Sequence, residues 1–321
     1  MMSHVIDRGP EALKEQKRHS RLVDSLIRLV KEKPMATFGG IIVILMFLTG
    51  IFAHFLAPHA YDVMILSSRL MPPSAEYPMG TDQLGRDLLS RIIYGAQVSM
   101  IVGLAGATLT TIVATIIGLF SGFYGGKFDI VIQRFVDGWM AFPALFLILS
   151  IMALVGPGLL QVILVLGLLG GISQSRIVRS AVIGIRENIY VEAAKAIGAP
   201  NRIILTRHIL PNITAPIIII FTLAMGTTIL GEATLSFLGF GIPPPMPTWG
   251  AMLSGEGRAY MYQAPWLAIW PGLALGLVVW GINIFGDGLR DLLDPRLRGG
   301  LGRYGKVKVK KSLIAKRGQS L

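Results

Sequence analysis

Cysteine is absent from the 321-residue sequence, and charged side chains make up only 15% of it. The first absence excludes a disulfide framework and thiolate chemistry, although it implies nothing about the redox compartment. The second argues against an ordinary soluble domain, in which about 25% of residues are charged. Hydrophobic residues account for 53% of the chain, and the mean hydropathy is +0.63. The composition therefore indicates an integral membrane protein.

The apolar residues form six runs near the length of about 20 residues that a helix needs to cross a bilayer. The third and fourth runs are separated only by Gly156-Pro157-Gly158, a tripeptide typical of a tight turn. The first run is longer than a signal-peptide core and is read as a retained anchor. We therefore predict an all-α, polytopic membrane helix bundle with six transmembrane helices, at residues 36–57, 98–120, 139–157, 158–175, 213–236 and 264–286.

Lysine and arginine are distributed very unevenly between the segments that join these runs. Of the 30 basic residues, 26 lie in residues 1–35, 121–138, 174–212 and 287–321, and four lie in residues 58–97 and 237–263. Because basic residues accumulate on the cytoplasmic side of a membrane, this split places both termini in the cytoplasm. It also accounts for the net charge of +12 without a nucleic-acid partner. The tail either remains solvated or is attracted to anionic membrane lipid.

Two segments beside the spans, residues 21–33 and 82–97, are amphipathic. Both predict helices that lie in the membrane interface or pack as loop helices against the bundle. The chain then divides into a cytoplasmic N-terminal segment, a first transmembrane helix, an extracytoplasmic segment with an interfacial helix, a five-helix core and a basic cytoplasmic tail. These parts are residues 1–35, 36–57, 58–97, 98–286 and 287–321.

The sequence contains no nucleotide-binding loop. Gly125-Gly126-Lys127 resembles part of one, but Ser121 replaces the first glycine and Phe128 replaces the hydroxyl residue that reaches magnesium. The five histidines form no cluster with a third metal ligand, and no catalytic grouping is present. We therefore expect no enzymatic activity, cofactor or metal site in this chain.

One carboxylate, Glu232, lies near the interior of an apolar run. An ionisable group inside a membrane span is costly enough to suggest a function. Glu232 either belongs to a transport pathway or gate near the outer leaflet, or sits at the outer interface without a special role. A lone carboxylate without charged partners argues against the rival class of protein, a carrier driven by an ion gradient.

A polar, basic segment, residues 186–211, separates two of the apolar runs. Residues Glu192–Ile197 are good helix formers, and Gly198 then supplies a helix stop. A second helical run, residues 201–210, is expected to end before Pro211. The segment is therefore predicted to be a helix–turn–helix elbow that projects into the cytoplasm. The alternative is a solvated basic loop.

The elbow contains a spaced motif. Glu-Ala-Ala, three residues, glycine, nine residues, an aliphatic residue, any residue and Leu-Pro is the pattern of the cytoplasmic loop of importer-type ABC transporter permeases. This chain resembles the pattern at Glu192, Ala193, Ala194, Gly198, Leu210 and Pro211. His208 departs from it by replacing the aliphatic residue. Segments that look like the dipeptide/oligopeptide branch extend the resemblance to about residues 20–300: Gly80–Asp87, Arg207–Asn212, Leu235–Gly239, Pro247–Gly250 and Gly286–Asp291.

The resemblance implies the type I ABC importer permease fold and the partners of that family. Such a chain pairs with a second permease subunit, with one or two ATPase subunits that hold ATP and magnesium, and with an extracytoplasmic solute-binding protein. The complex lies in a bacterial inner membrane, and the elbow docks on an ATPase subunit and transmits its closure to the spans. The implied solute is a di- or oligopeptide, with a nickel chelate, glutathione or another small solute as alternatives.

Overall fold

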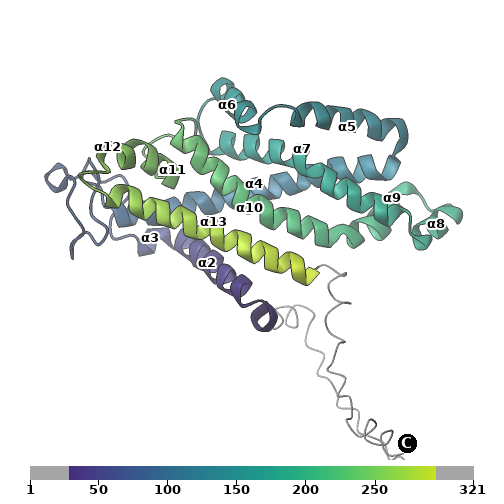
Figure 1. Ribbon diagram of the computed structural model, residues 1–321, viewed down its shortest axis with the longest axis horizontal. Helices are drawn as coiled ribbons and strands as arrows, with labels where there is room; N and C mark the ends of the chain where they lie inside the picture. Colours follow the sequence, from purple (N-terminus) through teal and green to yellow (C-terminus); the bar gives the residue numbers. More distant parts are fainter. Residues whose placement is uncertain (1–28, 294–321) are drawn as a thin grey trace, which may run out of the picture.

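The computed structural model describes residues 29–293 of the chain. Its long helices lie side by side along the longest axis and form a bundle, and the described part contains no strand (Figure 1). The predicted all-α membrane bundle is therefore confirmed. Residues 1–28 and 294–321, which include most of the predicted N-terminal amphipathic helix and the basic tail, lie outside the described residues. Five helices are long and apolar enough to cross a membrane: α2 (Pro34–Ile51), α4 (Leu88–Tyr124), α7 (Leu159–Arg186), α10 (Thr214–Phe237) and α13 (Trp266–Leu293).

The remaining predicted span, residues 139–157, is part of a bent pair of helices. α5 (Gly126–Met140) and α6 (Ala144–Val155) meet at an angle of 86°. α6 has 12 residues and is therefore about 18 Å long, too short for a hydrocarbon core of roughly 30 Å. Gly158, just beyond α6, donates a hydrogen bond of 3.1 Å to the carbonyl of Gly241, at the end of the bundle away from α8. The pair thus connects the end of α4 to the start of α7, and counted as one bent span it brings the candidate spans among the described residues to six.

The predicted interfacial helix, residues 82–97, overlaps the start of α4. α4 begins at Leu88 and continues directly into the membrane span. The Asp87 carboxylate caps the helix, because it accepts hydrogen bonds from the Ser90 N–H at 3.0 Å and from its hydroxyl at 2.6 Å. Leu88 is the first helical residue, and the helix extends without interruption for 37 residues. A separate interfacial helix is therefore not formed here.

The segment before α4 turns around Asp82, whose side chain is fully buried. Its carboxylate accepts hydrogen bonds from the backbone N–H groups of Leu84 and Arg86, at 2.8 and 2.9 Å. The guanidinium groups of Arg86 and Arg91 lie 2.6 and 3.1 Å from the same carboxylate. The polar face of this segment is therefore buried as an ion-pair cluster, which agrees with the alternative of packing against the bundle and not with a helix that lies in the membrane interface.

Helical backbone runs without a break from Asn201 to Phe237, so the second leg of the elbow does not end before Pro211 as predicted. The chain passes through a π-helical stretch, η2 (Ile204–Ile209), and a 3-10 stretch, η3 (Leu210–Ile213), before α10 begins. Pro211 lies in the first turn of η3. Wider and tighter turns around it accommodate the ring and the missing N–H. The second leg and α10 therefore form one continuous rod.

Close packing of the bundle depends on small residues where helices cross. A Cβ atom added to Gly118 of α4 would lie 2.5 Å from the carbonyl oxygen of Ser175 in α7, and one added to Gly39 of α2 would lie 2.5 Å from that of Gly281 in α13. Only glycine permits such approaches, as is common between membrane helices. These two contacts fix α4 against α7 and α2 against α13.

Short elements cover the end of the bundle away from α8 (Figure 1). After α2, the chain forms α3 (Ala53–Leu56) and a loop that contains η1 (Leu66–Ser68). Between α10 and α13 it forms α11 (Trp249–Met252), η4 (Leu253–Gly257) and α12 (Arg258–Tyr260). The Arg69 guanidinium donates a hydrogen bond of 3.2 Å to the Tyr260 hydroxyl and joins the two loops. We call this end, residues 58–87 and 238–265, the loop end, and the end that holds residues 186–211 the elbow end.

Candidate coupling surface and transmembrane cavity

The elbow is formed by two short helices at the tip of the bundle, α8 (Ile189–Ala196) and α9 (Asn201–Ile203) (Figure 1). Gly198 lies between them with a φ of +78°. The next residue, Ala199, donates a backbone hydrogen bond of 3.0 Å to the carbonyl of Ala194 and closes the turn. A positive φ is accessible to glycine at little cost, whereas other residues are strained there. The helix stop predicted at Gly198 is therefore present.

The inner face of the elbow packs on the bundle. Val191 and Ile204 are fully buried, and Ala194, from the motif, is 6% exposed. They belong to one apolar cluster with Val178 and Val182 of α7. Because close-packed side chains resist relative movement, the elbow is held in a fixed position against α7 and α10.

Two basic side chains, from the end of α7 and from the elbow, bind the last turn of α4. Arg186, the last residue of α7, donates hydrogen bonds of 3.0 and 3.2 Å to the carbonyls of Gly122 and Phe123. Carbonyls in the last turn of a helix lack partners inside the helix, and a guanidinium satisfies them well. The Lys195 ammonium lies 5.9 Å from the centre of the Phe123 ring. The elbow is therefore attached to α4 as well as to α7 and α10.

The outer face of the elbow is apolar and open. Glu192 and Ala193 are exposed, as a binding motif requires. Ile189 and Ile197 are each 84% exposed and lie four residues to either side of Ala193. Ile197 directly follows α8, so this spacing places all three side chains on one side of the elbow. Sequence reasoning did not select these isoleucines. Their spacing from Ala193 was the available signal, but which face of α8 is covered becomes apparent only when the packing on α7 is known.

His208, which departs from the motif pattern, lies between the two legs of the elbow. Its ring is half-buried and lies 6.3 Å from the ring of Tyr190 in α8, measured between centroids. Leu210 is half-buried and Pro211 is exposed. The imidazole therefore fills the space between the legs that an aliphatic side chain would fill. The role of the motif residues in coupling stays a prediction at this point.

Glu232 is 1% exposed and faces the loop end. Its carboxylate accepts hydrogen bonds from the hydroxyl groups of Ser236, at 2.6 Å, and Thr248. Thr248 caps α11 by accepting a hydrogen bond of 3.2 Å from the N–H of Ala251. Glu232 thus joins α10 to the segment that covers the loop end. Its assignment to the pathway or gate stays a prediction.

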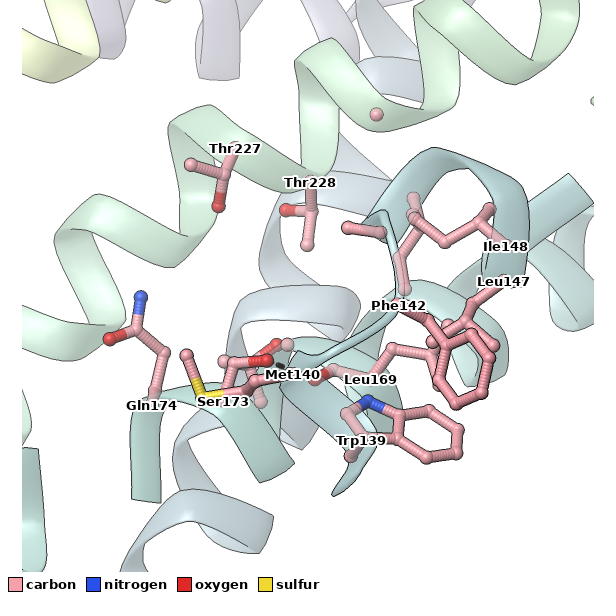
Figure 2. Close-up of a pocket in the computed structure, with 15 residues that line it drawn as sticks. Trp139, Met140, Phe142, Leu147, Ile148, Leu169, Ser173, Gln174, Thr227 and Thr228 are labelled. Carbon is pink, nitrogen blue, oxygen red and sulfur yellow. Dashed lines mark hydrogen bonds between the residues drawn. The ribbon is translucent and has the colours of Figure 1, made fainter. Parts of the chain in front are cut away.

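A cavity of about 400 Å³ lies between α4, α7, α10 and the link from α5 to α6 (Figure 2). Trp139 of α5 and Phe142 of the link form an apolar wall, together with leucine and isoleucine side chains. The opposite side contains the polar groups of five residues from three helices. These are Thr110, Ser173, Gln174, Thr227 and Thr228. The cavity is of a size that fits a small organic molecule, since such sites measure roughly 300–1,000 Å³.

Ion pairs hold the α5 side of this cavity in place. The Arg179 guanidinium of α7 donates a hydrogen bond of 2.6 Å to the Asp129 carboxylate near the start of α5. Asp137, near the end of α5, is paired with Arg176 of α7. The two pairs connect the same two helices at both ends of α5. The bent span is therefore fixed to α7, the helix that also carries the elbow.

A helical membrane bundle with a bent span, a docked elbow and a polar-lined cavity is the architecture of a transport permease. A family model described as a binding-protein-dependent transport system inner membrane component matches residues 114–299, and one described as the N-terminal TM domain of oligopeptide transport permease C matches residues 20–73. The chain belongs to this family of binding-protein-dependent ABC importer permeases, whose members are transport subunits and not catalytic subunits. Membership sets aside the rival class of ion-gradient carriers.

Named relatives transport peptides. The dipeptide transport permease DppC of Alkalihalophilus pseudofirmus is 44% identical over 269 residues, 84% of this chain and 88% of the relative. The probable D,D-dipeptide transport permease DdpC of Escherichia coli K12 is 36% identical over 92% of this chain and 99% of its own length. The glutathione transport permease GsiD of E. coli O6:K15:H31 is 38% identical over 85% of this chain and 90% of its own length. A solved structure of the MetNI methionine ABC transporter aligns with 64% of this chain and 96% of its own chain, at 16% identity and a TM-score of 0.49.

Proposed function

We propose that this chain is one of the two permease subunits of an ATP-driven peptide importer in a bacterial inner membrane. The other permease subunit, one or two ATPase subunits with ATP and magnesium, and an extracytoplasmic solute-binding protein complete the complex. Support comes from the dipeptide and glutathione permeases to which the chain is similar. The elbow and both termini lie in the cytoplasm, on the side where 26 of the 30 basic residues gather.

The solute is a di- or oligopeptide. Glutathione, itself a short peptide, is the alternative that a 38% identical relative favours. A nickel chelate remains the second alternative, on the resemblance of the motifs alone. Solute choice in such importers rests largely on the binding protein. This chain therefore needs to bind only the chemical groups that are common to all solutes of the class.

The elbow docks on an ATPase subunit and passes its movement to the spans. The observation that carries this assignment is the exposure of Ile189 and Ile197, 84% each, beside the exposed Glu192. These two isoleucines and the exposed Ala193 between them form an apolar patch outside the membrane spans, and such a patch favours a protein contact. The inner face is meanwhile packed on α7 and α10. A surface that binds a partner is thus joined rigidly to helices that cross the membrane.

Co-purification of the ATPase with a doubly substituted chain tests the assignment. Ile189→Asp together with Ile197→Asp should leave membrane insertion intact, since both side chains are exposed. Burying an isoleucine is worth about 1.5–3 kcal/mol, so losing two weakens docking by more than about 100-fold. The ATPase should then no longer purify with the chain. The matched control is Leu66→Asp, a 71% exposed apolar residue at the loop end, which should retain the ATPase. Retention by the double variant would refute docking at the elbow.

A further inference from the structure

Several hollows of the bundle lie along one face of α7. The cavity of Figure 2 contacts this helix at Leu166, Gly170 and Ser173. A second hollow of about 890 Å³, open toward the elbow end, contacts it at Ile177 and Gly184. These positions follow one another in steps of three or four residues, except for the longer, two-turn step to Gly184. Residues at such spacing share one side of a helix.

The same continuity is found on α10. A third hollow of about 330 Å³ is lined by Pro216, Ile219 and Leu223, and the cavity of Figure 2 continues the face at Thr227 and Gly231. The second and third hollows share lining residues with each other. The three hollows therefore follow one another along the seam between α7 and α10 from the middle of the bundle to the elbow end, and Arg290 of α13 also lines the two nearer the elbow. We call this row of hollows the α7–α10 groove.

The upper part of the groove, the cavity of Figure 2, is polar without being charged. The Thr227 hydroxyl donates to the carbonyl of Ala224 at 3.1 Å, and the Thr228 hydroxyl to the same carbonyl at 2.7 Å. The Ser173 hydroxyl donates to Leu169 at 3.2 Å. Each hydroxyl has thereby used its proton and retains an oxygen that accepts hydrogen bonds. No aspartate, glutamate, lysine or arginine lines this cavity.

Gln174 supplies what the hydroxyls lack. Figure 2 shows its carboxamide pointing from α7 toward α10, where Thr227 lies. Within residues 29–293, the carboxamide makes no hydrogen bond in this structure. It therefore offers two N–H donors and one acceptor to whatever occupies the groove. An uncharged donor and acceptor beside hydroxyl acceptors match the N–H and C=O groups of a peptide bond.

We infer that the α7–α10 groove is this chain's wall of the solute path, and that Gln174 and Thr227 bind the backbone amide of a passing peptide. The inference rests on the proposed function and adds to it the contacting residues and the part of the solute they recognise. A peptide bond is common to all solutes of the class, whereas their side chains differ, so contacts to the amide suit a permease that moves many peptides. A lipid acyl chain in the same place would leave the Gln174 carboxamide unpaired, at a cost that hydrogen bonding to a peptide avoids.

Thiol labelling tests the contact, because the chain has no cysteine and any introduced thiol is unique in it. Gln174→Cys and Thr227→Cys report on the groove. Gln161→Cys, on the same helix but outside the lining residues, is the matched control. The complete importer is reconstituted in liposomes and treated with a small neutral maleimide, with or without transport of alanylalanine. We expect the peptide to slow labelling at positions 174 and 227 severalfold and to leave position 161 unchanged.

A transport measurement with Gln174→Leu complements the labelling. Removal of one neutral hydrogen bond should lower the alanylalanine transported per ATP hydrolysed by roughly two- to tenfold, whereas Gln161→Leu should have no effect. Uptake by the wild-type importer, measured with alanylalanine and with glutathione, reports separately on the proposed function. If neither solute is taken up, the peptide assignment fails. If wild-type uptake is normal, but peptide does not slow labelling and Gln174→Leu does not lower the alanylalanine transported per ATP, the solute does not contact the groove and only the inference is refuted. Protection of position 174 by added lipid, and not by peptide, would refute it as well.

Discussion

Gly198 shows how one residue can be decisive for coupling without making a contact of its own. Its φ is +78°, yet nothing lies within 4 Å of the place where a Cβ atom would stand. A side chain at this position is therefore not excluded by its neighbours in this chain. It costs about 1–2 kcal/mol in backbone strain and presents itself to whatever docks on the elbow.

Gly198→Asp should accumulate normally in the membrane and lose solute uptake. The strain alone is tolerable, whereas a carboxylate left unpaired in an interface costs several kcal/mol. Membrane content by immunoblot and solute uptake by whole cells measure the two effects. Gly156→Asp is the matched control, since Gly156 has a φ of +88° and equally open surroundings but lies at the α6–α7 turn. Equal loss of uptake in both variants would mean that strain, and not docking, is responsible.

At the scale of elements, the elbow can act on the bundle because its two short helices are directly connected to two different spans. Its first leg follows α7 directly, and its second leg continues into α10 without a break. Arg186 then ties the end of α7 to the end of α4 through two carbonyls. A movement of the elbow reaches three spans at once, and its precision depends on this anchor.

Replacement of the anchor should uncouple the elbow without preventing docking. In Arg186→Ala, two charge-assisted hydrogen bonds, each worth about 1.5–3 kcal/mol, are lost, so part of each ATPase stroke moves the elbow alone. We expect the ATPase to purify with the variant and uptake per ATP hydrolysed to fall severalfold. Lys127→Ala, which removes an exposed basic side chain of α5 outside the elbow, serves as control and should behave as wild type. Loss of the ATPase from Arg186→Ala would show that the anchor shapes the docking surface itself.

The elements differ in how far the sequence could predict them. The helix stop at Gly198 was predictable, because a positive φ is a local requirement with a local signature. The buried face around Asp82 was not, because an amphipathic pattern reveals two faces but not which one meets water. Nor was continuity through Pro211, since π and 3-10 turns depend on packing against α7. The cavity beside Gln174 lies between helices that are far apart in the sequence, so no local sequence pattern predicts it.

Over the whole molecule, the two ends of the bundle differ in kind. The elbow end gathers basic residues and the open apolar surface of α8, while the loop end is covered by short helices and by the buried cluster around Asp82. The α7–α10 groove runs toward the elbow end, and Glu232, hydrogen-bonded to Ser236 and Thr248, lies just beyond its other end. The loop end is thus covered by protein, whereas the hollows between the helices extend toward the elbow end.

This polarity leads to a topology that reporter fusions can check. The elbow end carries residues 186–211 and the start of α5, so fusions after residues 130 and 195 should report the cytoplasm. Fusions after residues 20 and 310, where further basic residues lie, should do the same. Fusions after residues 75 and 255 should report the opposite side, because both positions lie at the loop end. Phosphatase and fluorescent-protein fusions measure the two sides with opposite signals. A cytoplasmic signal at residue 75 would contradict the six-span arrangement. So would opposite signals at residues 130 and 195, because the bent pair must cross the membrane for α7 to return to the elbow end.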